Sequence, residues 1–156
     1  PTYKVFSDIG CYTLGANAPF NAINSCVDRG ASITMAKGAS DAGLHPAVAV
    51  IGDSTFTHSG MTGLLIAQRN ADVTIVISDN ETTAMTGGQD SAGTGRLEAI
   101  CAASVSSRTH RVVVPLKKNY EEMKQIIREE IEHHGVSVII PRRECIQTLA
   151  RKKRNK

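Results

Sequence analysis

Two uninterrupted apolar runs constrain the fold of this chain more than any other feature. They are Ala47–Ile51 and Val73–Ile77, and both consist mainly of β-branched residues. Runs of this kind fill parallel strands that are buried on both faces, because a strand with one solvated face alternates apolar and polar residues. We therefore expect an α/β domain with a mostly parallel sheet.

The rest of the chain repeats the order of a strand followed by a helix or an irregular crossover. Strands are expected near residues 3–8, 47–52, 73–79, 110–115 and 136–140. Helices are expected near residues 30–43, 58–69, 94–106 and 119–134. This order predicts a three-layer sandwich, in which helices cover both faces of the sheet.

The last of these helices has the clearest boundaries. Asn119 and Glu122 have the spacing of a capping box, and Gly135 follows the final turn. The expected apolar face consists of Met123, Ile126, Ile127 and Ile131. His133 and His134 fall in the last turn, where a positive charge suits the helix dipole, and we expect both to be solvated.

Polar residues follow both apolar runs where each strand is expected to end. Gly52, Asp53 and Ser54 follow the first run, and Asn80 follows the second. Ligands of open α/β sheets bind at the carboxyl ends of the strands. Mg²⁺ prefers oxygen ligands, commonly one or two carboxylates together with substrate phosphates. The side chains of Asp53 and Asn80, with the carbonyl oxygen of Thr82, are therefore predicted to hold a divalent ion against a diphosphate.

The segments after these ligands are suited to phosphate oxygens. Ser54 and Thr55 begin a stretch whose small residues let a helix start close to a ligand, and the first N–H groups of a helix are free to bind anions. The stretch 82–94 lacks periodicity and is predicted to wrap the diphosphate, carrying Met85 and Gln89 towards the reactive ring or a partner subunit.

Four ordered blocks carry a resemblance to a known family: Asp8–Gly15, Gly30–Gly38, Gly52–Met61 and Asp79–Gln89. They resemble consecutive blocks of the thiamine-diphosphate-binding domain of the indolepyruvate ferredoxin oxidoreductase alpha subunit, in the 2-oxoacid:ferredoxin oxidoreductase superfamily. Ser54 stands where the motif of thiamine-diphosphate enzymes has its second glycine.

The resemblance implies thiamine diphosphate and Mg²⁺ as cofactors, with Asp53, Asn80 and Thr82 as the metal ligands. The implied cofactor-binding residues are Gly10, Cys11, Gly30, Ser32, Gly52, Asp53, Ser54, Thr55, Asn80, Thr82, Thr83, Met85 and Thr86. His58 would stand on the substrate side of the thiazolium, where its imidazole could transfer a proton. A simple polar cap near a helix start explains His58 equally well.

The resemblance also implies a reaction, the oxidative decarboxylation of a 2-oxoacid to an acyl-CoA. Indolepyruvate or another arylpyruvate would be the substrate, coenzyme A the acyl acceptor and ferredoxin the electron acceptor. A pyrimidine-binding domain or subunit would complete the site, and iron–sulfur clusters would belong to missing domains or partners, because the chain has no repeated Cys-x-x-Cys run. The chain alone is therefore expected to be an inactive segment of a longer polypeptide.

Alternatives remain open at this stage. The chain could be another thiamine-diphosphate enzyme of the 2-oxoacid decarboxylating type, or a regulatory α/β domain that retains the fold without chemistry. A nucleotide-binding module is less consistent, because neither a Gly-x-Gly-x-x-Gly turn nor a Gly-Lys-Ser/Thr phosphate loop is present.

The distribution of charge argues against a nucleic-acid partner. The formal net charge is +3, but five of the 18 basic residues lie in Arg151–Arg154 and at Lys156, so the first 150 residues are slightly acidic. We expect a domain over residues 1–149 and a basic tail or linker stub over 150–156. No apolar stretch reaches the roughly 18 residues of a membrane span, and no secretion signal is present, so a cytoplasmic location is predicted.

The four cysteines show neither zinc spacing nor a pattern of disulfides. Cys26, Cys101 and Cys145 are expected to be small core residues. Cys11 is expected against the cofactor. Asp28 and Arg29 stand before Gly30, where close relatives in the family that the chain resembles are expected to have apolar residues. These two charged residues would influence substrate choice only if they face the cofactor.

Two expectations concern the surface. His45 precedes Pro46 in a loop and is expected to be structural or exposed. The face that would meet a pyrimidine domain is expected to be apolar, so the isolated chain should self-associate.

Overall fold

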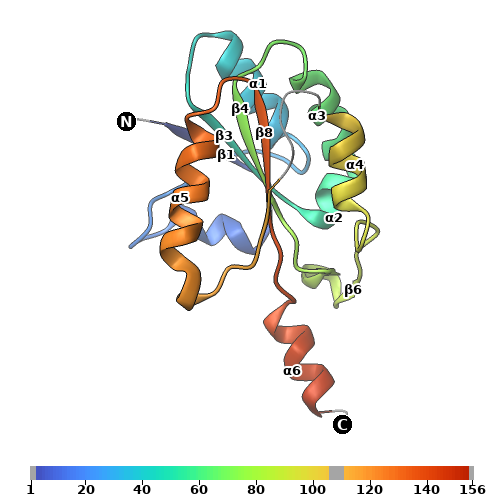
Figure 1. Cartoon of the computed structure of the whole chain (residues 1–156). Coiled ribbons are helices and arrows are strands. Elements are labelled where there is room, and N and C mark those ends of the chain that lie inside the picture. Colours follow the sequence, from blue (N-terminus) through green and yellow to red (C-terminus); the bar gives the residue numbers. More distant parts are fainter. Residues whose placement is uncertain (1–2, 106–110, 155–156) are drawn as a thin grey trace.

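The computed structural model describes residues 3–105 and 111–154 of the chain. Residues 106 and 110, at the ends of two predicted elements, and residues 155 and 156 of the predicted tail lie outside these ranges. Six parallel strands form one sheet in the order β2-β1-β3-β4-β8-β7 (Figure 1). Their bounds are β1 Lys4–Ser7, β2 Ser25–Cys26, β3 Ala47–Gly52, β4 Val73–Ser78, β7 Arg111–Val113 and β8 Val136–Pro141.

The two apolar runs form the centre of this sheet, as predicted. β3 pairs with β4 in parallel from Ala47 opposite Val73 to Gly52 opposite Ser78, so the two strands end level with each other. β1 flanks β3, and β8 flanks β4. Residues that follow β1, β3 and β4 therefore meet at one edge of the sheet, which we call the carboxyl edge. The opposite edge, where these strands begin, is the amino edge.

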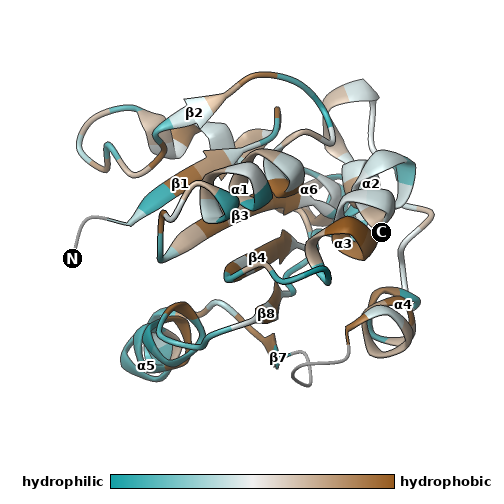
Figure 2. Cartoon of the chain, turned by 90° about the horizontal axis from the view of Figure 1, so that it is seen from above, coloured by the Kyte–Doolittle hydropathy of each residue, from teal (hydrophilic) through white to brown (hydrophobic). Residues whose placement is uncertain are grey.

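Helices cover both faces of the sheet, which confirms the three-layer prediction. The α-helices in the described ranges are α1 Ser32–Asp41, α2 Asp53–Thr55, α3 Met61–Ala67, α4 Leu97–Ser104, α5 Tyr120–Ile131 and α6 Ile146–Arg154. A π-helical turn, Phe56–Gly60, joins α2 to α3. Viewed along the sheet, α3 and α4 lie on one side of the strands and α5 on the other (Figure 2).

The core divides in the same way, because successive side chains of a strand point to opposite faces. Ile75 and Ile77 of β4 belong to the larger cluster, which also contains Ile33 of α1, Leu64 of α3 and residues of α4. Val76, between them, packs against the smaller cluster under α5, which consists of Val113, Ile126 and Ile139.

The predicted capping box of α5 is wrong. The Asn119 side chain accepts a hydrogen bond from the N–H of Leu116 at 3.1 Å and donates one to the carbonyl oxygen of Val114 at 2.8 Å. Within the described part of the chain, no side chain caps the first turn of α5. A 3₁₀ turn, Lys117–Asn119, precedes the helix, and Asn119 closes this turn instead.

The apolar face and the end of α5 are closer to the prediction. Ile126 is buried, Met123 and Ile131 are partly buried, and Ile127 is exposed. The helix ends at Ile131, and Gly135 in the turn beyond it has a φ of +109° that favours glycine.

Short elements at the carboxyl edge escaped the prediction. A 3₁₀ turn, Cys11–Ala16, follows β1. The irregular stretch after β4 contains two short antiparallel strands of two residues each, β5 Thr82–Thr83 and β6 Gln89–Asp90. The described part of the predicted basic tail, residues 150–154, is helical and belongs to α6. This helix extends away from the sheet (Figure 1). The boundary at residue 149 stays a prediction. Within the described ranges no helix has the length and apolarity needed to cross a bilayer.

The cysteines agree with the prediction only in part. Cys101 is buried in the larger cluster, and Cys145 is partly buried. Cys26 is exposed, so its prediction as a core residue is wrong. The reason is its place at the end of β2, a two-residue strand at the margin of the sheet.

Candidate functional site

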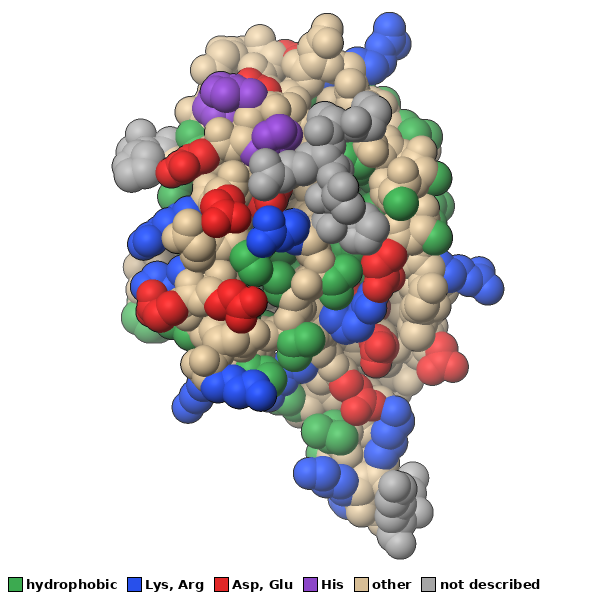
Figure 3. Space-filling view, in the orientation of Figure 1, with side chains coloured by type: hydrophobic (Ala, Val, Ile, Leu, Met, Phe, Trp, Pro, Cys, Tyr) green, Lys and Arg blue, Asp and Glu red, His purple; other side chains and the backbone are tan. Residues whose placement is uncertain are grey.

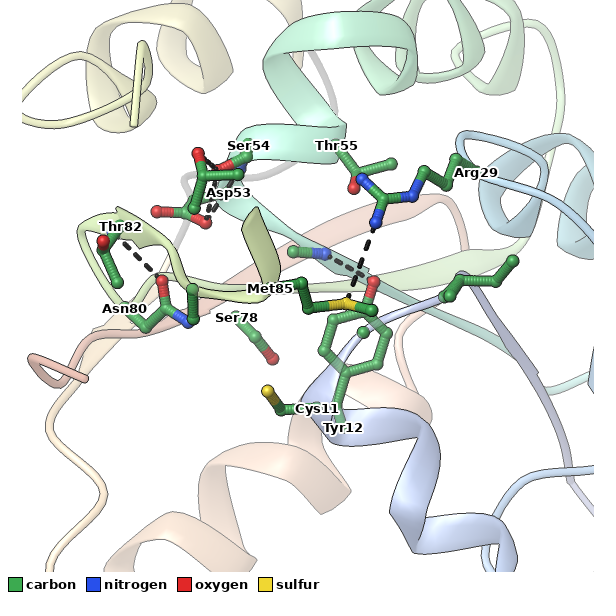
Figure 4. A pocket seen from close by; sticks show the side chains of 15 residues that line it. Cys11, Tyr12, Arg29, Asp53, Ser54, Thr55, Ser78, Asn80, Thr82 and Met85 are labelled. Carbon is green, nitrogen blue, oxygen red and sulfur yellow. Dashed lines mark hydrogen bonds between the residues drawn. The ribbon is translucent and has the colours of Figure 1, made fainter. Parts of the chain in front are cut away.

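A hollow opens at the carboxyl edge, as the polar residues after the two apolar runs predicted. It is formed where the segments after β1, β3 and β4 converge (Figure 4). Its lining residues are Ile9, Gly10, Cys11, Tyr12, Arg29, Gly52, Asp53, Ser54, Thr55, Ser78, Asn80, Thr82, Thr83, Ala84 and Met85.

Asp53 is the buried carboxylate of this hollow. It is the first residue of α2 and is 3 % exposed. Its Oδ1 accepts a hydrogen bond from the N–H of Ser54 at 2.8 Å. Its Oδ2 is buried and accepts no hydrogen bond from the described residues. Burial raises the pKa of Asp53, because the charged form is poorly solvated there, while the Ser54 N–H opposes this shift.

Asn80 and Thr82 lie on the other side of the same space (Figure 4). The Asn80 Oδ1 accepts a hydrogen bond from the N–H of Thr82 at 3.1 Å, which fixes the direction of the carboxamide. Glu81 between them has a φ of +60°. Such a conformation is uncommon outside glycine and is often found at functional sites. The local chain is therefore held in a tight turn around Asn80.

Hydroxyl groups join the loops after β3 and β4. The Oγ of Ser54 and the Oγ1 of Thr83 are 2.9 Å apart and share a hydrogen bond. Ser54 and Thr55 belong to α2, which opens a continuous helical stretch that includes the π-helical turn, and π-bulges are frequent at functional sites. The hollow therefore presents hydroxyl groups and a helix start beside the carboxylate of Asp53.

Tyr12 forms part of the wall, a role that the sequence analysis missed. Its hydroxyl oxygen accepts a hydrogen bond from the N–H of Gly52 at 3.0 Å. A Cβ at Gly10 would overlap the Tyr12 ring, and a Cβ at Gly52 would lie 3.2 Å from it. Burial raises the pKa of the Tyr12 phenol above its ordinary value. The two glycines thus allow the ring to lie against the carboxyl ends of β1 and β3.

Of the two charged residues before Gly30, Arg29 lines the hollow and Asp28 does not. The Arg29 side chain reaches the hollow, where Nη2 lies 3.7 Å from the sulfur of Met85. Asp28 is exposed and does not line the hollow. Cys11 lines the hollow and is exposed.

Four predicted site residues lie outside this lining. Ser32 is fully buried, and its N–H donates to Oδ1 of Asp8 at 2.8 Å. Gly30 has a φ of +86° and packs so closely on Ser59 that a Cβ would overlap the serine side chain. Thr86 is exposed and donates a hydrogen bond to Gln89 at 2.7 Å.

His58 is the fourth of these residues. It is exposed and lines a neighbouring hollow together with Arg29, Ser54, Thr55 and Thr83. The two hollows share four of these residues, so His58 lies beside the main site without entering it.

An ionic network next to the site holds the loop that carries Asn80, and no pattern in the sequence indicated it. Arg142, just after β8, donates from Nε to Asp79 and from Nη1 to Glu98 of α4, both at 2.6 Å. Asp79 is 2 % exposed, and these contacts raise the pKa of Arg142. The carbonyl oxygen of Asn80 accepts a hydrogen bond from the N–H of Cys145 at 3.2 Å.

The arrangement has the chemistry of a cation site next to an anion site. A cation beside Oδ2 of Asp53 would provide the partner that this buried oxygen lacks among the described residues. Asn80 and Thr82 line the same hollow, and their amide and carbonyl groups are of the hard-oxygen type that such a cation accepts. The hydroxyl groups and the helix start are suited to phosphate oxygens.

Comparison with known proteins gives one family match and several relatives. Residues 8–140 match the family described as thiamine pyrophosphate enzyme, C-terminal TPP binding domain. The chain is 38 % identical over 160 residues to the indolepyruvate oxidoreductase subunit IorA of Archaeoglobus fulgidus, an alignment that covers 95 % of this chain and 25 % of the relative. The IorA subunit of Pyrococcus horikoshii is also 38 % identical, over 167 residues that cover 89 % of this chain and 25 % of the relative. The chain thus spans about a quarter of the length of these relatives.

Solved structures share the fold. A 2-oxoglutarate:ferredoxin oxidoreductase from Magnetococcus marinus superposes with a TM-score of 0.73 at 19 % identity, covering 92 % of this chain and 54 % of that chain. Benzoylformate decarboxylase from Polynucleobacter necessarius superposes with a TM-score of 0.69 at 20 % identity, covering 92 % and 30 %.

Proposed function

Because the chain belongs to the C-terminal TPP-binding domain family of thiamine pyrophosphate enzymes, we propose that its carboxyl-edge hollow binds thiamine diphosphate through a divalent ion, Mg²⁺. The metal ligands are Asp53, Asn80 and the carbonyl oxygen of Thr82. The observation that carries this assignment is the buried Oδ2 of Asp53, which accepts no hydrogen bond from the described residues. Mg²⁺ suits the donors, because it prefers carboxylate, amide and carbonyl oxygens together with phosphate.

The other lining residues hold the rest of the cofactor. The hydroxyl groups of Ser54 and Thr83 and the first N–H groups of the helical stretch from Asp53 receive diphosphate oxygens. Tyr12 and Met85 provide apolar walls for the ring system. The cofactor, when bound, supplies the electron sink for decarboxylation of a 2-oxoacid.

The direct cofactor contacts predicted for Gly30, Ser32 and Thr86 are the least supported part of this assignment. Ser32 is better placed to position Asp8, since its N–H binds that carboxylate. Gly30 is better placed to let the α1 start pack on Ser59.

For the whole protein we propose a 2-oxoacid:ferredoxin oxidoreductase of the indolepyruvate type. The similarity to IorA subunits over most of this chain supports it. In such an enzyme a pyrimidine-binding domain or subunit completes the site, an arylpyruvate is decarboxylated to an acyl-CoA, and ferredoxin takes the electrons through iron–sulfur clusters of other segments. A cytoplasmic location belongs to the same proposal.

His58 is proposed to face the substrate side of the site. Its place beside Arg29, in the hollow next to the main one, supports an approach to the acid group of a 2-oxoacid. A proton-transfer role for His58 stays a prediction.

Self-association of the chain also stays a prediction. Three exposed apolar side chains support it, Leu14 and Phe20 between β1 and β2 and Val27 directly after β2, because each is more than two-thirds exposed. Sedimentation at high concentration tests it, and a strictly monomeric species would contradict it.

Calorimetry of thiamine diphosphate binding tests the proposed site. The chain should bind the cofactor weakly with Mg²⁺ and lose binding in EDTA, because the ion bridges the diphosphate to Asp53. Asp53→Ala should abolish the metal-dependent binding, whereas His58→Ala, next to the same hollow, should keep it. Binding in EDTA, or equal losses in both variants, would contradict the ligand set.

A further inference from the structure

A second cluster of metal-ligating side chains lies at the amino edge of the sheet. His45 stands two residues before β3, Asp72 one residue before β4, and His134 two residues before β8. One nitrogen or oxygen atom of each side chain lies within 4.8 Å of the others. Figure 3 shows histidine side chains at the end of the molecule opposite α6.

Asp72 is the centre of this cluster. Its Oδ2 lies 3.1 Å from Nδ1 of His134 and 3.8 Å from Nδ1 of His45. Its Oδ1 accepts a hydrogen bond from the N–H of Gly135, which holds the carboxylate in place. The two imidazole rings stack with centroids 4.4 Å apart and an interplanar angle of 18°.

We propose that His45, Asp72 and His134 form a binding site for a divalent transition-metal ion, with Zn²⁺ as the best match. Two imidazoles and one carboxylate are a donor set that Zn²⁺ accepts. A tetrahedral ion with ligands at about 2.0–2.1 Å places neighbouring ligand atoms roughly 3.3 Å apart. The separations of 3.1 and 3.8 Å from Oδ2 of Asp72 bracket that spacing.

One adjustment accompanies binding. The lone pairs of stacked rings run nearly parallel, so one ring must turn before both nitrogens face the same ion. His134 has the freedom to do so, because its side chain is 76 % exposed. Water completes the coordination shell on the solvent side.

The ion would connect three turns that each lead into a central strand. The chain separates Asp72 from His134 by 62 residues, so the unfolded chain does not hold the ligands together. A metal that binds the folded chain preferentially raises its stability by mass action. The site therefore acts as a clamp on the amino edge of β3, β4 and β8.

This site differs in chemistry from the one at the carboxyl edge. Imidazole nitrogens favour Zn²⁺, Ni²⁺ and Cu²⁺, whereas the oxygen donors around Asp53 favour Mg²⁺. The free cysteines are the competing ligands for Zn²⁺, and Cys11 and Cys26 are exposed.

Metal titrations of the 156-residue chain without thiamine diphosphate test the proposal, with Zn²⁺ and with Co²⁺ as a spectroscopic substitute. One equivalent of Zn²⁺ should raise the thermal midpoint. Bound Co²⁺ should show a visible spectrum of nitrogen and oxygen ligation, without a sulfur charge-transfer band. His134→Gln and His45→Gln should each weaken Zn²⁺ binding by roughly tenfold or more.

Two control variants make the result unambiguous. His133→Gln changes the neighbouring histidine and should leave the affinity for Zn²⁺ unchanged. Asp53→Ala should also keep it, because the ion binds at the other edge. A sulfur charge-transfer band, wild-type affinity in both His134→Gln and His45→Gln, or loss of binding in Asp53→Ala would overturn the proposal.

Discussion

The two edges of the central sheet hold their aspartates in opposite ways. Asp53 at the carboxyl edge is 3 % exposed, and one of its oxygens accepts no hydrogen bond from the described residues. Asp72 at the amino edge has a side chain that is 36 % exposed, and both of its oxygens have partners. Burial raises the pKa of Asp53, whereas the hydrogen bond from His134 lowers the pKa of Asp72. The carboxylate with one oxygen that has no partner among the described residues therefore lies in a pocket, and the carboxylate with partners for both oxygens lies in a surface turn.

The largest expected effect comes from removing the guanidinium group of Arg142, which pairs with Asp79 and Glu98 next to the carboxyl edge. Arg142→Met should destabilise the fold by about 3 kcal/mol, because it leaves the buried Asp79 without its ionic partner. Urea unfolding measures it. Arg143→Met is the matched control, since Arg143 is exposed and should change the free energy of unfolding by less than about 0.5 kcal/mol. Equal effects of the two variants would show that the network does not hold the loop.

Two glycines differ in how tightly they are packed: Gly60 lies in a tightly packed region beside the pocket, and Gly38 lies on an open surface of α1. Gly60→Ala should cost about 1–3 kcal/mol, because its Cβ would lie 2.6 Å from Cδ1 of Ile51 and 3.0 Å from Cδ2 of Phe56. Gly38→Ala in α1 should stabilise the chain by about 0.5–1 kcal/mol, since no atom lies within 4 Å of the new methyl group. Thermal unfolding of both variants measures the difference, and a destabilised Gly38→Ala would contradict the described packing.

The opposite pKa shifts predict opposite pH dependences, which should be the smallest of these effects. The raised pKa of Asp53 makes its contribution favourable at low pH, and this contribution is lost as pH rises above the ordinary aspartate value of about 3.9. The lowered pKa of Asp72 gives a contribution that is present above about 3.9 and lost as pH falls below it.

Asparagine variants separate the two contributions. In EDTA, Asp53→Asn should remove a decline of stability with rising pH, and Asp72→Asn should remove a decline with falling pH. Denaturant unfolding from pH values below about 3.9 up to neutral pH measures both slopes. Identical slopes in the two variants would mean that the edges do not differ electrostatically.

The sequence indicated the carboxyl edge because the residues that line its hollow adjoin the strands. The runs Ala47–Ile51 and Val73–Ile77 predicted both central strands, and the polar residues that follow them line the hollow. Asp53, Asn80 and Thr82 could thus be identified from local order alone. Tyr12 needed the structure, because its ring packs on both Gly10, which follows β1, and Gly52, the last residue of β3, and these two glycines are far apart in the chain.

The amino edge was hidden for a related reason. His45, Asp72 and His134 come together only through the sheet order, in which β4 lies between β3 and β8. His134 is solvated as expected, because its side chain is 76 % exposed, but the sequence did not reveal that it also bonds Asp72 and stacks on His45. His133 is only partly exposed and its Nε2 is buried, so the expectation of a solvated ring is wrong for that residue. The ionic contacts of Arg142 could not be predicted for the same reason, because its partners Asp79 and Glu98 are distant in the chain. Local patterns cannot report such contacts.

The most direct test of the central claim is electron paramagnetic resonance of Mn²⁺, used in place of Mg²⁺, with the chain and thiamine diphosphate. The account predicts one bound Mn²⁺ per chain only when the cofactor is present, and none in Asp53→Asn. Unchanged Mn²⁺ and cofactor binding in Asp53→Asn would contradict the proposal that this carboxylate holds the metal against the diphosphate.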